Sequence, residues 1–118
     1  AGAEAKPYQS GFKGLKTMGL PKNKQTDDLF VSILQLKTVD ECYRYFEDIC
    51  TIQEVRDLGQ RLEIAKALDG GSNYQATIEK TGVSTATIGR VKRCLLYGAG
   101  GYRMVLDRLR ERDKGENE

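Results

Sequence analysis

The segment from Gly82 to Arg93 constrains the fold of this chain more than any other, because it combines a tight turn with the start of a helix. Gly82 can adopt a positive φ without steric cost, which suits it to end one helix. Ser84, two residues later, is a favoured N-cap residue and can begin the next helix. A helix, a glycine turn and a capped second helix together predict a helix-turn-helix motif.

The predicted second helix begins with three small residues, Thr85, Ala86 and Thr87. Small side chains at the N-terminus of a helix let its backbone approach the edges of base pairs in a major groove. Ile88 and Val91 lie three positions apart, so they share one apolar face. The alternative is an ordinary capped surface helix, but the basic residues that follow favour a helix that binds DNA. These basic residues are Arg90, Lys92 and Arg93.

Charge is distributed unevenly along the chain, although the formal net charge is only +2. Residues 27–57 are rich in acids, whereas residues 84–112 are mostly basic. A basic patch confined to one region is typical of a protein that binds a polyanion such as nucleic acid. The alternative, a solvated helix face, fits the arginines from Arg103 to Arg112 better than those near Arg90.

The residue types argue against an enzyme and against a metal site. The three cysteines have no close CxxC spacing, which disfavours a disulfide framework and a zinc ribbon. We expect them to be reduced and buried as small apolar groups in a cytoplasmic protein. The chain has no histidine, which excludes Ser-His and Cys-His catalysis. No apolar run is long enough to span a membrane, and no metal or cofactor is expected.

Helix signals follow one another from Thr26 onwards, and no strand-like alternation competes with them. Thr26 is predicted to cap the first helix. Thr38 and Thr51 each precede a glutamate by three residues, so each predicts a capping box at the start of a helix. The third helix is predicted to end at Gly70-Gly71.

The second half of the chain predicts three more helices, which makes the chain all-α with six helices. The fourth helix begins at Ser72 or Asn73 and runs through Lys80. The fifth begins at Ser84 and runs to about Tyr97, before a glycine-rich break. The sixth covers about residues 102–113.

The predicted organisation is one helix-turn-helix domain over residues 26–113, between a flexible arm of residues 1–25 and a frayed polar tail of residues 114–118. Met18 could be the natural start, which would make residues 1–17 a remnant of expression. The alternative is a native basic arm that touches DNA. Six short amphipathic helices bury little apolar surface in one chain, so we expect a homodimer.

The chain resembles the Trp repressor superfamily, and within it the small TrpR-like branch known as YerC/YecD. The resemblance covers roughly residues 27–109. It is carried by Leu58-Gly59-Gln60-Arg61 with Ile64, by Gly71 and Gly82, and by the run Ala86-Thr87-Ile88-Gly89-Arg90-Val91-Lys92-Arg93-Cys94-Leu95. It implies an intertwined all-α homodimer whose two recognition helices enter successive major grooves, about 34 Å apart, on a palindromic operator in double-stranded DNA.

The resemblance also implies roles for individual residues on the DNA side. Thr85, Ala86 and Thr87 match the base-reading positions. The residues expected at phosphates, which set affinity more than sequence choice, are Lys80, Gly89, Lys92 and Arg93.

Members of this family bind an amino acid, and the resemblance implies an effector site in this chain. Arg61 and Arg90 match the positions that hold the carboxylate, and Thr51 matches a third contact. Val91 and Cys94 replace the glycine and serine of the tryptophan repressor at the ligand. A branched valine should crowd a flat indole, so tryptophan is disfavoured and histidine is the leading candidate; binding of DNA without an effector is the alternative.

The sequence therefore predicts a dimeric, sequence-specific transcriptional repressor, with amino-acid biosynthesis genes as expected targets. The alternative is a protein-interaction module that has kept the helix-turn-helix fold and lost DNA reading. Steep loss of nucleic-acid binding with salt would favour the repressor.

Overall fold

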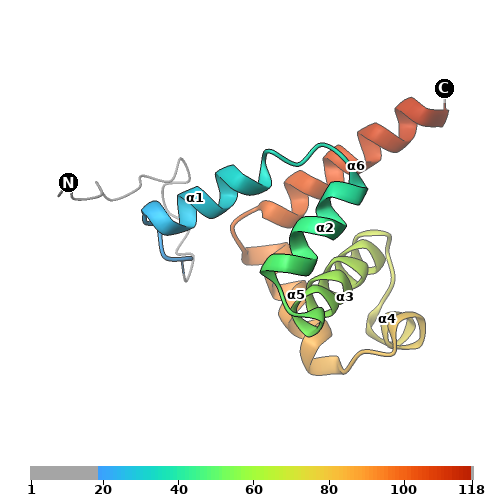
Figure 1. Cartoon of the computed structure of the whole chain (residues 1–118). Helices are drawn as coiled ribbons and strands as arrows, with labels where there is room; N and C mark the ends of the chain where they lie inside the picture. The colour runs from blue at the N-terminus through green and yellow to red at the C-terminus, as the bar shows by residue number, and fades with distance from the viewer. Residues whose placement is uncertain (1–18, 118) are drawn as a thin grey trace. The chain divides into compact units, whose positions relative to one another are not determined.

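The structure, a computed structural model, describes residues 19–117, and in that range the chain forms six helices and no strand (Figure 1). The all-α prediction is confirmed. Most of the predicted N-terminal arm lies outside the described residues, and its last two residues, Lys24 and Gln25, already belong to the first helix. The helices are α1 (Lys24–Ile33), α2 (Val39–Ile49), α3 (Ile52–Asp69), α4 (Tyr74–Thr81), α5 (Thr85–Tyr97) and α6 (Gly101–Asn117).

The contacts within the chain divide it into two compact units, one up to Ile52 and one from Gln53 onwards. The first unit contains α1 and α2, and the second contains α4, α5, α6 and all of α3 after its first residue. This boundary falls inside the stretch that the sequence predicted as one domain. A physical reason is that neither α1 nor α2 has a buried residue, so the buried core belongs to the second unit.

In the first unit, the helix starts follow local capping rules. Asn23 caps α1, because its Oδ1 accepts a hydrogen bond of 2.9 Å from the backbone N–H of Thr26. The prediction that Thr26 is the cap is therefore wrong: Asn23, a more favoured capping residue, lies three positions earlier. Thr38 caps α2 as predicted, with its Oγ1 3.1 Å from the N–H of Glu41. The Glu41 carboxylate accepts from the N–H of Lys37 at 2.9 Å.

The core of the second unit is built from α3, α5 and α6. Ile64 and Ala65 from α3 pack with Ile88 and Val91 from α5, and Leu106 of α6 completes the cluster. All five side chains are buried, with exposed fractions of 4% or less. The core is small, in agreement with the modest core expected for a chain of this length.

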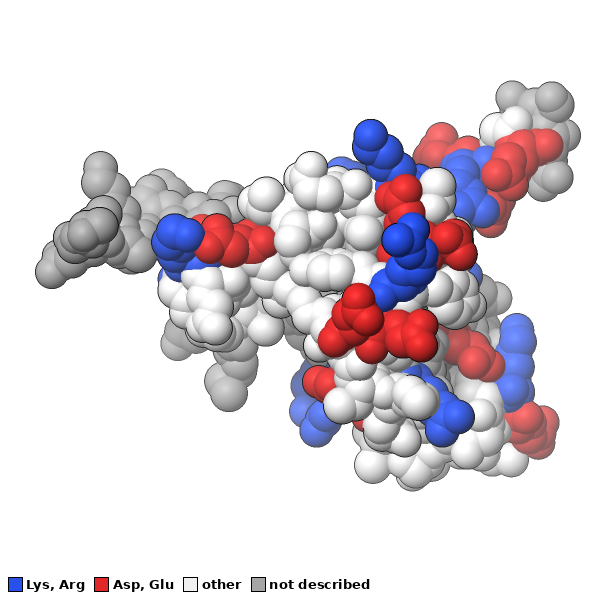
Figure 2. All heavy atoms as spheres, viewed as in Figure 1, with Lys and Arg blue, Asp and Glu red and all other residues white. Residues whose placement is uncertain are grey.

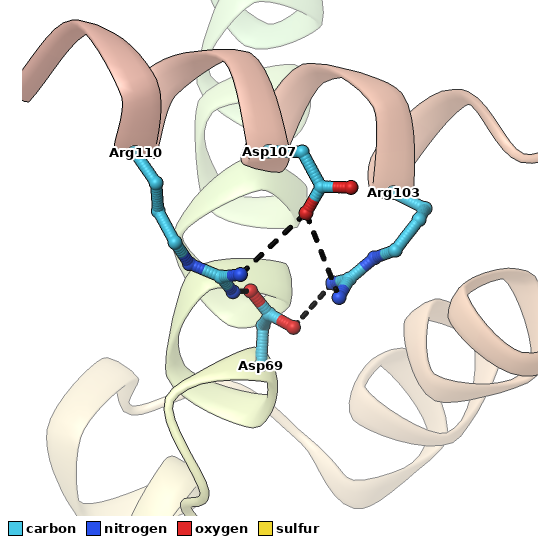
Figure 3. Close-up of polar contacts among 4 residues, drawn as sticks. All are labelled: Asp69, Arg103, Asp107 and Arg110. Atoms are coloured by element: carbon cyan, nitrogen blue, oxygen red, sulfur yellow. Dashed lines mark hydrogen bonds and ion pairs between the residues drawn. The ribbon is translucent and has the colours of Figure 1, made fainter.

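The end of α3 is fixed to α6 by ion pairs around Asp69 (Figure 3). Its carboxylate pairs with Arg103 and with Arg110, both on α6. Asp107 lies between these arginines, 3.9 Å from Arg103 and 3.5 Å from Arg110. The Asp69 side chain is only 12% exposed, whereas the arginines are 47% and 52% exposed. Since α3 ends at Asp69, this cluster fixes the point where the chain turns towards α4.

The ends of α3 and α6 have different causes, a glycine after α3 and an ion pair near the end of α6. Gly71, with φ of 97°, lets the chain leave α3, and the N–H of Ser72 returns to the carbonyl of Ala67 at 3.0 Å. The sixth helix ends at Asn117, so its predicted end at Asp113 is wrong. An ion pair of 3.6 Å between Arg112 and Glu116, one turn apart, supports the extension. Figure 2 shows basic and acidic side chains intermixed along the outer part of α6, as expected for a solvated face.

The three cysteines are free, as predicted. The prediction that they are buried is wrong for Cys42 and Cys94, which are exposed. Large apolar side chains are exposed on both units. Those with an exposed fraction above 60% are Leu20, Leu34, Val39, Tyr43, Ile52, Leu96 and Tyr97.

Candidate nucleic-acid interface

The helix-turn-helix is formed by α4 and α5, which a short turn joins in Figure 1. Asn73 caps α4, with its Oδ1 2.8 Å from the N–H of Ala76, which decides between Ser72 and Asn73. Gly82 ends α4 in the left-handed conformation with φ of 70°, and its N–H donates to the carbonyl of Ile78 at 2.7 Å. Ser84 caps α5 through a longer contact of 3.4 Å from the N–H of Thr87. The motif predicted from the sequence is confirmed.

Thr77 is the buried residue of α4. Its side chain is fully buried, and its hydroxyl donates to the carbonyl of Asn73 at 2.7 Å. The polar atom is therefore satisfied by the helix itself, which leaves the methyl group free to pack. On the facing helix, Ile88 and Val91 are buried, so α5 presents the opposite side to solvent.

The predicted base-reading residues lie in the first turn of α5. Thr85 and Ala86 are exposed, and Thr87 is half-buried. The hydroxyl of Thr87 lies 3.2 Å from that of Ser84, so it is engaged with the cap. No acidic residue occurs in this turn, so no side chain of the turn itself repels phosphate or competes for the helix N-terminus.

The predicted phosphate residues differ in their surroundings. Lys80 and Arg93 are exposed, and neither forms an ion pair within the described part of the chain. The ammonium of Lys92 lies over the ring of Tyr74, 4.8 Å from its centroid, in a cation–π contact between α5 and α4. Gly89 is half-buried, and a Cβ placed there would lie 3.6 Å from the Tyr74 hydroxyl, which is ordinary contact.

A hollow of about 290 Å³ lies beside the base-reading residues, and its walls come from α3 and α5. Arg61 and Arg90, the predicted carboxylate ligands, both line it, so the structure brings them together. Val91 and Cys94 do not: Val91 is buried in the core, and Cys94 is exposed elsewhere on α5. Thr51 belongs to the first unit, and its role at the site stays a prediction. The full lining is Asp57, Gln60, Arg61, Ala86, Thr87 and Arg90.

Sequence reasoning missed Asp57 and Gln60. Asp57 precedes Arg61 by four residues, and positions four apart share a face of a helix, so its spacing carried a signal. Gln60 is adjacent to Arg61, and its spacing from Arg61 carried no such signal. Asp57 Oδ1 accepts a hydrogen bond of 2.8 Å from Gln53 Nε2. No ion pair within residues 19–117 involves Asp57, Arg61 or Arg90. The hollow therefore holds two positive charges and one negative charge that are not joined to one another by ion pairs.

Tyr102, near the start of α6, is influenced by charges in this region. Burial raises the pKa of its phenol above the ordinary value, the nearby Cys94 adds to the increase, and the positive charge of Arg61 opposes it. The neutral phenol is therefore the form that the folded unit favours.

Comparison with known proteins decides the family. The family model of the Trp repressor protein matches residues 24–110, which include every helix except the outer end of α6. This chain belongs to the Trp repressor family. It is 54% identical to the uncharacterized protein YerC of Bacillus subtilis over 90 residues, which cover 76% of this chain and 86% of YerC. The family is one of DNA-binding regulators and not of enzymes.

Two solved structures of this family have the same fold. A candidate Trp repressor from Staphylococcus aureus matches with a TM-score of 0.73 and 44% identity, over 75% of this chain and 89% of that one. A TrpR-like protein from Eubacterium eligens matches with a TM-score of 0.72 and 51% identity, over 75% and 91%.

Two further findings concern the described residues alone. Their cysteine and acidic side chains form no group of three or more that could hold a metal ion. None of their helices is both long enough and apolar enough to cross a membrane.

Proposed function

We propose that this protein is a sequence-specific transcriptional repressor that binds double-stranded DNA. The observation that carries the proposal is the first turn of α5, where Thr85 and Ala86 are exposed and no acid is present. Arg93 and Lys80 lie at the surface of the same motif without ion-pair partners among the described residues, so both are available to phosphates.

The repressor acts as a homodimer in this proposal. Large apolar side chains such as Leu34, Tyr43, Leu96 and Tyr97 are more than 60% exposed in the single chain. Leu96 and Tyr97 are neighbours at the end of α5, and adjacent exposed apolar side chains of this kind are suited to burial in an interface. A second copy of the chain that covers these side chains would also supply a second recognition helix for a palindromic operator.

The hollow between α3 and α5 is the proposed effector site, with Arg61 and Arg90 as ligands of a carboxylate. A guanidinium donates two parallel hydrogen bonds to a carboxylate, and neither arginine is held by an ion pair among the described residues. The lining contains no aromatic or large aliphatic side chain, which favours a polar amino acid such as histidine over tryptophan. Control of amino-acid biosynthesis genes follows as the proposed role.

A selection of genomic fragments on the purified protein tests this function. It is run with and without a pool of the twenty amino acids, on protein shown to be a folded dimer. We expect enrichment of palindromic sites near biosynthetic genes, and a change in enrichment when the pool is present. Absence of enriched sites in both conditions would contradict the repressor and favour a protein-interaction module with the same fold.

A further inference from the structure

The effector hollow contains a negative charge as well as two positive ones. Asp57 and Arg61 line it from α3, one helical turn apart, and Arg90 lines it from α5. We propose that Asp57 accepts the ammonium group of the effector, so that the hollow binds a zwitterionic α-amino acid and rejects the same acid without its amine. This inference rests on the proposed effector site and names the ligand class that the site selects.

Asp57 has the capacity for this role. The one hydrogen bond to its carboxylate among the described residues comes from Gln53 Nε2, which is neutral and contacts Oδ1 alone. A carboxylate has about four acceptor positions, so the remaining positions can take the N–H groups of an ammonium. Because Gln53 carries no charge, it holds the carboxylate in place without neutralising it. Asp57 is half-buried, and partial burial strengthens its attraction to a cation relative to bulk water.

The arrangement of charges favours a zwitterion over a simple anion. Asp57 and Arg61 are four residues apart on one helix, yet they do not form an ion pair with each other. A carboxylate without an amine could bind the arginines, but it would bring a second negative charge close to Asp57. An α-amino acid places its ammonium one carbon from its carboxylate, so both charges of the ligand meet an opposite charge in the hollow.

The same geometry explains how such a ligand would affect DNA binding. Asp57 and Arg61 belong to α3, whereas Arg90, Ala86 and Thr87 belong to α5. A ligand held by both helices links the first turn of α5, which carries the proposed base-reading residues, to the core helix α3. If the ligand binds more tightly at one relative position of α3 and α5, that difference in its binding free energy appears as a change in DNA affinity.

The test compares matched ligands and matched variants in the full-length protein. Each of the twenty L-amino acids is first screened by thermal shift, with L-histidine as the leading candidate. The dissociation constant of the best binder and that of its deaminated acid, imidazole-4-propionate for histidine, are then measured by calorimetry. The variants are Asp57→Asn, which keeps the size of the side chain, and Glu63→Gln, which removes an exposed acid of α3 outside the hollow.

We expect the wild type and Glu63→Gln to bind the amino acid at least about tenfold more tightly than its deaminated acid, which corresponds to one charged hydrogen bond. Asp57→Asn should bind the two ligands with nearly equal affinity. Equal affinities in the wild type, a preference that survives Asp57→Asn, or no binding of any amino acid would overturn the inference.

DNA binding without ligand is measured in parallel and separates this inference from the proposed function. Asp57→Asn should bind a selected fragment at least as tightly as the wild type, because it removes a negative charge beside the recognition helix. If the wild type binds DNA specifically and binds the amino acid and its deaminated acid equally well, only the role of Asp57 is wrong. If the wild type does not bind DNA, the proposed function itself fails.

Discussion

Replacement of Asp69 by asparagine should destabilise the protein, although the new side chain has nearly the same shape. Asp69 is the last residue of α3, and its carboxylate pairs with Arg103 and Arg110 of α6 (Figure 3). Asparagine keeps a hydrogen-bonding oxygen but removes the negative charge between two guanidinium groups. The matched control is Asp107→Asn, which removes a carboxylate that faces the same two arginines.

The exposure of each group sets the expected size of the effect. A hydrogen bond to a charged group in a protected site contributes about 1.5–3 kcal/mol, whereas an exposed ion pair contributes about 0.2–1 kcal/mol. Asp69 is 12% exposed but its partners are about half exposed, so each contact falls between these limits. We expect Asp69→Asn to lower the free energy of unfolding by about 2 kcal/mol. Asp107 is 54% exposed with longer contacts, so Asp107→Asn should cost about 0.5 kcal/mol or less.

Urea unfolding followed by circular dichroism measures both values. All proteins are compared at the same concentration, because the stability of a homodimer depends on the protomer concentration. A double-mutant cycle of Asp69→Asn with Arg110→Gln isolates the pair itself. If Asp69→Asn costs no more than Asp107→Asn, the burial of Asp69 does not strengthen its ion pairs and the reasoning is refuted.

Three further predictions follow from the second unit. Arg93→Ala should reduce the slope of log affinity for DNA against log salt concentration by about 0.9. Lys92→Ala should change this slope less, because the ammonium of Lys92 is engaged with Tyr74. Equal changes in the two variants, measured by fluorescence anisotropy, would show that Lys92 contacts phosphate as Arg93 does. Ile64→Ala should lower the free energy of unfolding in urea by about 3 kcal/mol, because Ile64 is fully buried, and a loss below about 1 kcal/mol would contradict tight packing of this core. Because folding raises the pKa of Tyr102, the contribution of its neutral phenol to the free energy of unfolding should be fully present below a pH of about 10 and should be lost as the pH rises further. Unfolding in urea at a series of pH values should show a smaller fall in the free energy of unfolding for Tyr102→Phe. An identical fall would exclude Tyr102 as its source.

The features that the sequence predicted well are those determined by nearby residues. Gly82 ends α4 and Ser84 begins α5 because each acts on backbone groups within four residues of it. The burial of Ile88 and Val91 followed from their spacing on one face of a helix. Thr38 capped α2 for the same local reason.

The features that the sequence missed depend on alternatives or on distant contacts. Asn23 and Thr26 both offered a cap for α1, and the structure uses Asn23, which is the more favoured residue type at this position. The exposure of Cys94 depends on which face of α5 packs against the core. Asp57 became part of the candidate site only when α3 and α5 came together around the hollow. Its spacing from Arg61 placed them on one face, but no local rule indicated that α5 would supply Arg90 to the same place.

The most direct test of DNA reading by α5 is the ratio of affinities for a selected fragment and a scrambled version of it. Ala86→Leu adds bulk at an exposed position of the first turn without altering the cap, and Arg93→Ala removes a proposed phosphate contact. We expect a ratio of about a thousand or more for the wild type, and a similar ratio at lower affinity for Arg93→Ala. The ratio should fall close to one for Ala86→Leu, with non-specific binding retained. An unchanged ratio in Ala86→Leu would contradict the account, because the first turn of α5 would then not read the DNA.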